Sequence, residues 1–317
     1  MEIPANVFDD NRRFLWGMCY RMTGNAADSE DIVQEVFVKA LENPPRDTAQ
    51  PWRPWLVRVA INLSRDYLRC RRRQGYTGPW LPSPLPTEPE ESTDARQNNM
   101  PSARYDLTES ITIAFLLALE ALTPAQRAVL LLRDVFDYPA DEVADLLGMT
   151  DGNVRVTLHR ARRTMKEYDR NRVTHGPARN EKTRGAIERF LECLSNRDAK
   201  GLEQILTEDV VAISDGGGEV MALRSPMRGR QKVLQLVTRL NEVYGETTRT
   251  SLCALNGLPA LLVNRGKVKA GHASRFTMQC EVDNSGRIAQ LSYVFAPRKL
   301  TALETWQSNA LTGGASL

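Results

Sequence analysis

The sequence predicts a multidomain protein in which two all-α domains are followed by a C-terminal α+β domain. Apolar residues recur at helical spacing over residues 7–73 and 107–170, a proline-rich stretch separates these regions, and strand-like runs fill much of residues 180–317. A chain of 317 residues is also too long for one ordinary core. We expect boundaries at 1–74, 75–106 (the linker), 107–172 and 180–317.

Three helices are expected in the first region. "NRRFLWGMCYRMTG" stops at Gly24, and "AADSEDIVQEVFVKALEN" follows it. The apolar face predicted for this second helix consists of Ile32, Val33, Val36, Phe37, Ala40 and Leu41. After the loop "NPPRDTAQPWRPW", the stretch "LVRVAINLSRDYLRCRRR" combines an apolar face with arginines on the other side.

The linker, residues 75–106, contains six prolines between positions 79 and 101 together with acidic and small polar residues. This composition excludes a regular helix or strand. The stretch is either a simple spacer or a segment that docks in part, as its aromatic and apolar start "GPWLPSPLP" indicates.

The region after the linker is helical again. "SITIAFLLALEAL" predicts one long apolar helix, and Thr123 followed by Pro124 marks the start of the next. "DEVADLLG" is a short helix closed by Gly148, and "DGNVRVTLHRARRTMKEY" is a second helix that Thr150 can cap. Two helices joined by a tight turn predict a helix-turn-helix.

The C-terminal region mixes helices and strands. "EKTRGAIERFLECLSN", "AKGLEQILTED" and "RQKVLQLVTRLNEVYG" are predicted helices. The predicted strands are "VVAIS", "EVMAL", "TSLCAL", "ALLVN", "SRFTMQCEVD" and "RIAQLSYVF". Helices followed by a largely hairpin-connected sheet indicate an α+β domain.

Charge is segregated along the chain although the net charge is only +3. Residues 53–73 hold seven arginines against Asp66, whereas acidic residues dominate 28–42. This pattern predicts one polyanionic and one basic partner. The scattered cysteines and histidines suggest reduced thiols and no metal site, and the lack of a long apolar run leads us to expect a cytoplasmic protein without membrane contact.

The second helix of the helix-turn-helix would lie in the DNA major groove. Its side chains suit base edges, since Arg pairs with guanine, Asn with adenine, and methyl groups with thymine. The candidates are Asn153, Arg155, Val156, Thr157, His159 and Arg160, with Arg162, Arg163 and Lys166 placed for phosphates. The alternative is a solvated basic helix.

The arginine-rich helix has aromatic neighbours in Trp52, Trp55 and Tyr67. Aromatic faces beside cations suit unstacked, single-stranded bases. Packing of either tryptophan in the core is the alternative.

These segments resemble sigma-70 domains of bacterial RNA polymerase. "DSEDIVQEVFVKALEN" is similar to the helix that docks on the clamp of the polymerase β′ subunit, and the resemblance implies core binding by Asp28, Asp31, Gln34, Glu35 and Phe37. The partner expected for the chain is the polymerase core, with its β′ and β subunits. The next helix and its loop resemble the −10 reader, which implies Trp52, Trp55, Asn62, Arg65, Asp66 and Arg69. "LTPAQRAVLLLRDVFDYPADEVADLLGMTDGNVRVTLHRARRTM" resembles the −35 reader, with Asn153 to Arg163 on promoter DNA. Pro139 departs from the usual Ser or Thr cap.

With these two regions and a linker, the chain resembles an extracytoplasmic-function (ECF) sigma factor. "YTGPWLPSPL" and "SDGGGEV" are similar to the subgroup with a fused SnoaL-like domain, which has an NTF2-like cone. Ser83 stands where an acid is common, and "APRKL" replaces a more polar motif. The resemblance implies no catalysis, no cofactor, and a C-terminal domain that acts in cis on the sigma portion.

The stretch "SDGGGEV" admits several interpretations. A nucleotide loop lacks the Lys-Ser/Thr that should follow, and an enzyme site lacks partners for Asp215. A plain hairpin turn remains open, and so does a docking contact with the linker or the sigma domains. The docking hypothesis assigns an interdomain regulatory role to Trp80, Leu81, Pro82, Asp215, Gly216, Gly217 and Gly218.

Two rival functions remain at this point. A free-standing helix-turn-helix regulator leaves the acidic helix unexplained. A DNA-binding appendage on a ligand-binding or enzymatic domain is the other rival, and a small-molecule ligand in the C-terminal domain is left open.

Overall fold

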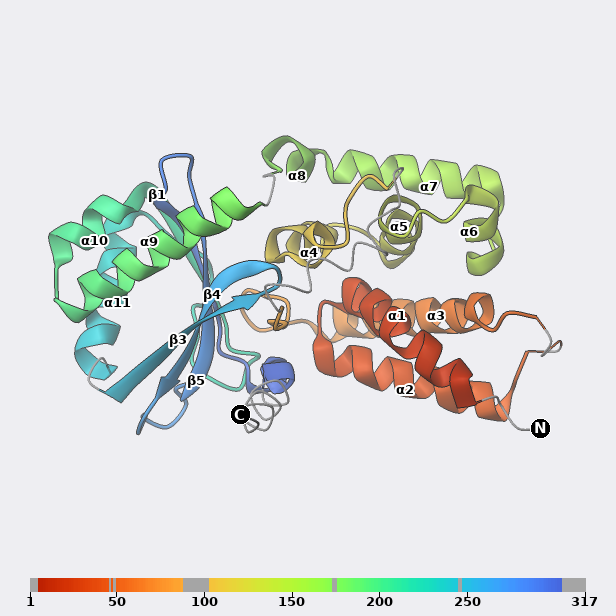
Figure 1. The fold of residues 1–317 in the computed structure, drawn as a ribbon, viewed down its shortest axis with the longest axis horizontal. Coiled ribbons are helices and arrows are strands. Elements are labelled where there is room, and N and C mark those ends of the chain that lie inside the picture. Colours follow the sequence, from red (N-terminus) through yellow and green to blue (C-terminus); the bar gives the residue numbers. More distant parts are fainter. Residues whose placement is uncertain are drawn as a thin grey trace, which may run out of the picture. The chain divides into compact units, whose positions relative to one another are not determined.

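The computed structural model describes residues 5–45, 47, 50–87, 103–172, 176–244 and 247–303. The chain divides into two compact units (Figure 1). Unit 1 comprises Met1–Gly75 and Thr93–Arg172, and unit 2 comprises Tyr76–Ser92 and Val173–Leu317. The first part of the linker therefore belongs to the same unit as the C-terminal α+β fold.

Unit 1 begins with three helices packed against one another: α1 (Ala5–Thr23), α2 (Ala26–Glu42) and α3 (Arg53–Gln74). Asn25 starts α2, because its side-chain oxygen accepts a hydrogen bond from the Ala27 N–H at 3.0 Å. The apolar faces of the three helices meet in a core that includes Leu15, Val36 and Ile61. Leu41 was predicted in this core, but it lies on the outer side of α2 with 62% of its surface exposed.

The rest of unit 1 is a series of short helices. They are η2 (Glu109–Ile111), α4 (Ile113–Leu119), α5 (Pro124–Leu130), η3 (Leu131–Val135), α6 (Ala140–Leu147), α7 (Asp151–Thr164) and α8 (Lys166–Asn171). The single long helix expected over 110–122 is wrong. Thr112 is extended, with ψ at 150°, and caps α4 through the Phe115 N–H, so the chain breaks there.

Unit 2 is a six-stranded sheet with helices packed on one face (Figure 1). Its helices are α9 (Pro177–Ser195), α10 (Ala199–Ile205) and α11 (Arg230–Tyr244). Its strands are β1 (Leu206–Asp215), β2 (Met227–Arg228), β3 (Thr248–Leu255), β4 (Leu258–Arg265), β5 (Arg275–Val282) and β6 (Ile288–Val294), followed by η5 (Pro297–Lys299). The sheet order is β2-β1-β6-β5-β4-β3, and only the β1–β6 pair is parallel. The core lies between helices and sheet.

The strand expected at "EVMAL" (219–223) does not form. The glycine turn folds the chain back, so that the N–H groups of Glu219 and Val220 both bond to the Gly216 carbonyl. Met221 is left exposed in irregular backbone, and β2 forms later in the chain. Across the described ranges, we find no helix with the length and apolarity needed to span a bilayer.

Candidate nucleic-acid interface and linker anchor

The helix-turn-helix is formed by α6 and α7. Gly148 ends α6 in the left-handed region, with φ 62° and ψ 41°, where glycine carries no steric penalty. Thr150 then accepts a hydrogen bond from the Asn153 N–H at 3.3 Å and starts α7. Because Val154, Leu158 and Ala161 are buried, the orientation of α7 about its axis is fixed.

The side of α7 opposite these buried residues carries the predicted base-reading residues. Asn153, Arg155, Val156, His159, Arg160 and Arg163 are exposed on α7, and Thr157 is half-buried at the edge. Spacings of one, four, five and eight residues from Arg155 place most of them on one helical face. The surface therefore combines base-pairing side chains with phosphate-binding cations.

Arg162 has a role that the sequence did not reveal. Its guanidinium makes a two-pronged ion pair with the buried carboxylate of Asp134, at 2.9 and 2.6 Å. The hydrogen bonds to Asp134 raise the pKa of Arg162. The pair ties α7 to η3, so Arg162 positions the reading helix, in contrast to the phosphate contact we expected.

The residues predicted for single-stranded bases lie partly on the surface of α3. Asn62, Asp66 and Arg69 are exposed, and Arg65 is half-buried. Asp66 and Arg69 form an ion pair at 2.7 Å. Trp52 is buried against Trp55, with ring centroids 6.4 Å apart, whereas Trp55 is half-buried. The structure thus favours the core-packing alternative for Trp52.

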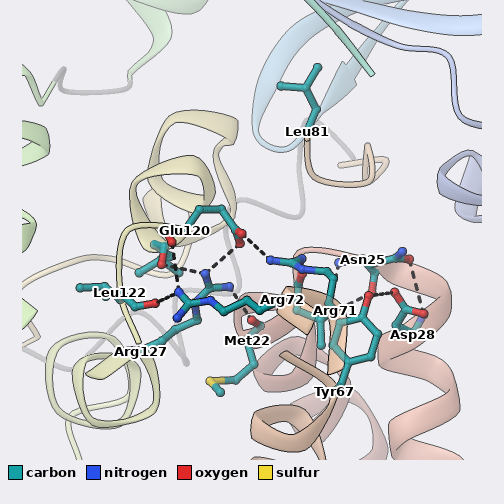
Figure 2. Close-up of polar contacts among 12 residues, drawn as sticks. Met22, Asn25, Asp28, Tyr67, Arg71, Arg72, Leu81, Glu120, Leu122 and Arg127 are labelled. Atoms are coloured by element: carbon teal, nitrogen blue, oxygen red, sulfur yellow. Dashed lines mark hydrogen bonds and ion pairs between the residues drawn. The ribbon is translucent and has the colours of Figure 1, made fainter. Parts of the chain in front are cut away.

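Other arginines of α3 face the second helical group of unit 1 (Figure 2). Arg71 forms an ion pair with Glu120, and Arg72 donates to the Leu122 carbonyl. Arg58 donates to the Asp145 carbonyl at 2.6 Å. These three arginines belong to the basic block, yet they are engaged within the protein.

Arg127 is the centre of the same network (Figure 2). Its side chain, 2% exposed, bonds to the carbonyls of Met22 and Leu119 at 2.7 Å and to Glu120 at 2.8 Å. Burial lowers the pKa of Arg127, and Glu120 counteracts this effect. Because Met22 is in α1 and Leu119 in α4, this one buried cation holds the first three helices of unit 1 (α1–α3) to the helices that follow the linker (η2 to α8). Sequence reasoning did not single out Arg127 or Glu120.

The acidic helix α2 presents Asp31, Gln34 and Glu35 to solvent. The same side carries two exposed apolar residues, Val38 at 45% and Leu41 at 62%. Exposed apolar side chains with a polar rim are typical of a protein-docking surface. We call these five residues the α2 face.

Two residues predicted to bind the polymerase core have structural partners instead of full exposure. Asp28 is half-buried and accepts the Tyr67 hydroxyl at 2.5 Å. Burial, and then this hydrogen bond, raise the pKa of Tyr67. Phe37 packs edge-on against Phe8, with centroids 4.7 Å apart. Sequence periodicity alone could not show that Asp28 and Phe37 contact other residues of the protein, unlike the exposed residues of the α2 face.

In unit 2, residues 76–87 of the linker pack on the domain, and Asp215 is the main anchor. Its carboxylate, fully buried, accepts the Tyr76 hydroxyl at 2.6 Å and the Leu81 N–H at 2.7 Å. Lys299 bonds to the same carboxylate at 2.7 Å and to the Leu81 carbonyl at 2.5 Å. Its ammonium also lies 4.9 Å from the Tyr76 ring and 4.6 Å from the Trp80 ring.

The three glycines shape the turn that presents Asp215. Gly217, with φ 64°, donates its N–H to the Asp215 carboxylate at 2.9 Å, and a Cβ there would lie 2.9 Å from the Ala296 side chain. A Cβ on Gly216 would lie 2.3 Å from the Val220 carbonyl oxygen. Gly218, with φ 77°, faces Thr77 of the linker. The sequence "SDGGGEV" therefore forms both a tight turn and a docking contact.

A second contact holds the end of the docked linker. The Leu85 N–H donates to the Asn256 side chain at 3.0 Å, and Leu85 accepts the Asn256 N–H at 2.8 Å. The Thr87 N–H bonds to the Ala254 carbonyl, and Pro86 bridges Leu255. The linker thus adds a short strand-like contact to the β3–β4 turn. Ser83 is fully buried between the two contacts.

Comparison with known proteins gives consistent results. Residues 7–74 match the family model "Sigma-70 region 2" and residues 112–165 match "Sigma-70, region 4". The chain is 33% identical over 248 residues to the ECF RNA polymerase sigma factor SigJ of Mycobacterium tuberculosis, covering 77% of this chain and 75% of that protein. It is 30% identical over 275 residues to SigG of the same organism, covering 78% and 70%.

A solved structure resembles nearly the whole chain. The crystal structure of Mycobacterium tuberculosis SigJ covers 94% of this chain and 99% of that chain, with 27% identity and a TM-score of 0.68. The predicted fold class, two helical sigma domains followed by a C-terminal α+β domain, is confirmed. The chain belongs to the ECF sigma factors, the RNA polymerase subunits that direct transcription to promoters.

Proposed function

We propose that the α2 face binds the polymerase core, through the β′ subunit, while α3 and α7 bind the −10 and −35 elements. The exposed side of α7 carries this proposal. Arg155 and Arg160 are available to fork onto guanine, and Asn153 to pair with adenine, on a helix whose rotation is fixed by buried residues. For −10 bases, Trp55, Asn62 and Arg69 remain accessible on α3.

Run-off transcription with core polymerase on promoters selected from a library tests the α2 face. Asp31→Lys combined with Glu35→Lys should weaken polymerase binding, most strongly at low salt, because these acids are exposed and screened by ions. Glu167→Lys on α8, also exposed, is the matched control. Transcription equal to wild type in the double variant would contradict the α2 assignment.

We further propose that the docked linker is the means by which unit 2 acts in cis on the sigma domains. The linker joins the region 2 and region 4 segments in sequence, and unit 2 holds its first part with a buried ion pair and paired backbone groups. Because residues 76–87 of the linker are bound to unit 2, only the rest of the linker is left to span the distance between the two sigma domains. Unit 2 thereby limits how far the two sigma domains can separate.

Gly217→Val separates this proposal from a plain turn. Valine at φ 64° is strained and would clash with Ala296, so the Asp215 contact should loosen. Gly286→Val, a second left-handed glycine in unit 2 but far from Asp215 in sequence, controls for general strain. If Gly217→Val folds and transcribes like wild type while releasing the linker to protease, the cis mechanism is wrong.

A further inference from the structure

Unit 2 contains a cavity of about 180 Å³ between α9, α11 and the sheet face that these helices cover. Its lining is mostly apolar and includes Phe190, Leu194, Val237, Leu240, Phe276 and Met278. Apolar cavities of about 150 Å³ accommodate one benzene ring, so this cavity has room for a single ring with a small substituent. An ion would lose its hydration in such surroundings, which favours an uncharged occupant.

Tyr293 supplies a polar group to this lining. Among the described residues, none forms a hydrogen bond with its hydroxyl, although a tyrosine this enclosed usually has a partner. The ring is held by stacking on Phe295, with centroids 5.8 Å apart and planes 18° apart. Burial raises the pKa of Tyr293, so the hydroxyl stays protonated at neutral pH and can donate a hydrogen bond.

Asn241 supplies an acceptor to the same lining. Its Nδ2 donates to the Leu194 carbonyl at 2.7 Å, and within the described ranges no group donates to its Oδ1. Arg265 also lines the cavity, but it has a further interaction within the protein, so recognition is assigned to the uncharged groups. A hydroxyl both accepts and donates, and therefore matches a protonated tyrosine together with an amide oxygen.

We propose that this cavity binds a small phenol, an uncharged aromatic ring with one hydroxyl group. The ring lies among the apolar side chains of α9, α11 and the sheet. The ligand hydroxyl accepts a hydrogen bond from Tyr293, and the Asn241 amide oxygen is the acceptor available for its proton. This ligand site is separate from promoter recognition and does not depend on it.

Calorimetric titration of the full chain with phenol tests the site, with toluene as an analogue of similar shape that lacks the hydroxyl. Both should bind saturably. Tyr293→Phe removes only one oxygen atom, so it should weaken phenol binding roughly two- to tenfold, the range for a neutral hydrogen bond, and leave toluene binding unchanged. Measuring both ligands on both proteins separates the hydrogen bond from any effect of the substitution on the cavity itself.

Thr250→Trp tests whether the cavity is the place where phenol binds. Thr250 lines the cavity from β3 and is exposed, so an indole there should fill the cavity and abolish binding of both ligands. Ser251→Trp is the matched control, because Ser251 is also exposed and strand alternation turns it to the opposite face of β3. The control variant should bind phenol as wild type does.

Three results would each overturn the phenol site. They are no saturable phenol binding by the folded wild-type chain, phenol binding that survives in Thr250→Trp, and a Tyr293→Phe variant in which phenol affinity is unchanged or falls only as much as toluene affinity. If Tyr293→Phe fails to fold, the comparison of Thr250→Trp with Ser251→Trp still tests the site. Run-off transcription by the wild-type chain without phenol measures the sigma function separately, so a failure of one is distinguishable from a failure of the other.

Discussion

The Asp215–Lys299 pair offers a quantitative test of the linker anchor. Lys299→Met keeps an aliphatic side chain but removes the ammonium, whose side chain is 5% exposed. Among the described residues, the fully buried Asp215 carboxylate then keeps the donors of Tyr76, Leu81 and Gly217. Removing one partner of a buried ion pair costs about 3–5 kcal/mol, because the remaining charge is left uncompensated.

Unit 2 spans about 160 residues, and a domain of this size loses about 2–4 °C in Tm per kcal/mol. We therefore expect the calorimetric transition of unit 2 to fall by about 6–20 °C in Lys299→Met. Arg298→Met is the matched control, since Arg298 is 87% exposed and pairs with Glu219 at 3.6 Å, and its effect should stay within about 0.5 kcal/mol.

A double-mutant cycle with Asp215→Asn isolates the pair. Asp215→Asn leaves Lys299 buried without its anion, so each single change should cost several kcal/mol, whereas the double variant should cost less than their sum by at least about 1 kcal/mol. Additive effects, or a Lys299→Met transition within 2 °C of wild type, would refute the reasoning that a buried ion pair anchors the linker.

Two further predictions concern unit 1. Glu120→Gln should lower the stability of unit 1 by about 2 kcal/mol near neutral pH, because Arg127 loses its anion. Burial raises the pKa of Glu120, but Arg127 and Arg71 lower it more, so the folded-state pKa lies below the unfolded value of about 4.3. The stabilisation by Glu120 is therefore present above a pH of about 4.3, and the stability curves of wild type and Glu120→Gln should converge as the pH falls below that value. Stability curves that stay parallel down to about two pH units below the unfolded pKa would contradict this. Arg155→Ala should weaken the free energy of DNA binding by about 1–3 kcal/mol for promoters that carry the base it reads, as measured in a binding titration. Arg163→Ala should weaken binding to all sequences alike and reduce the slope of log K against log salt concentration by about 0.9. An equal loss of affinity on every sequence for Arg155→Ala would exclude base reading.

Local patterns in the sequence were enough to predict most of the helices. Gly148 and Thr150 encode the end of α6 and the start of α7 through backbone effects that need no tertiary partner. The acidic and arginine-rich blocks indicated a basic and a polyanionic partner, and the family resemblance is confirmed by the matches to sigma-70 regions 2 and 4. Likewise, "SDGGGEV" indicated a turn, either a plain hairpin turn or a docking contact.

The tertiary structure decided which residues of each helix face or charge block are exposed and can contact a partner. Periodicity cannot tell an exposed Arg163 from an Arg162 that binds Asp134, since the partner lies 28 residues away. The same holds for Leu41, which was expected in the core but lies outside it because α1 and α3 cover only one side of α2.

Lys299 shows this limit most clearly, because 84 residues separate it from Asp215 and more than 200 from Leu81. The sequence by itself determined most of the elements, the charge blocks and the glycine turn, through backbone preferences and residue spacing. Only the folded structure decided which charges are buried together, because the desolvation that makes Lys299 and Arg127 important arises from segments distant in the chain.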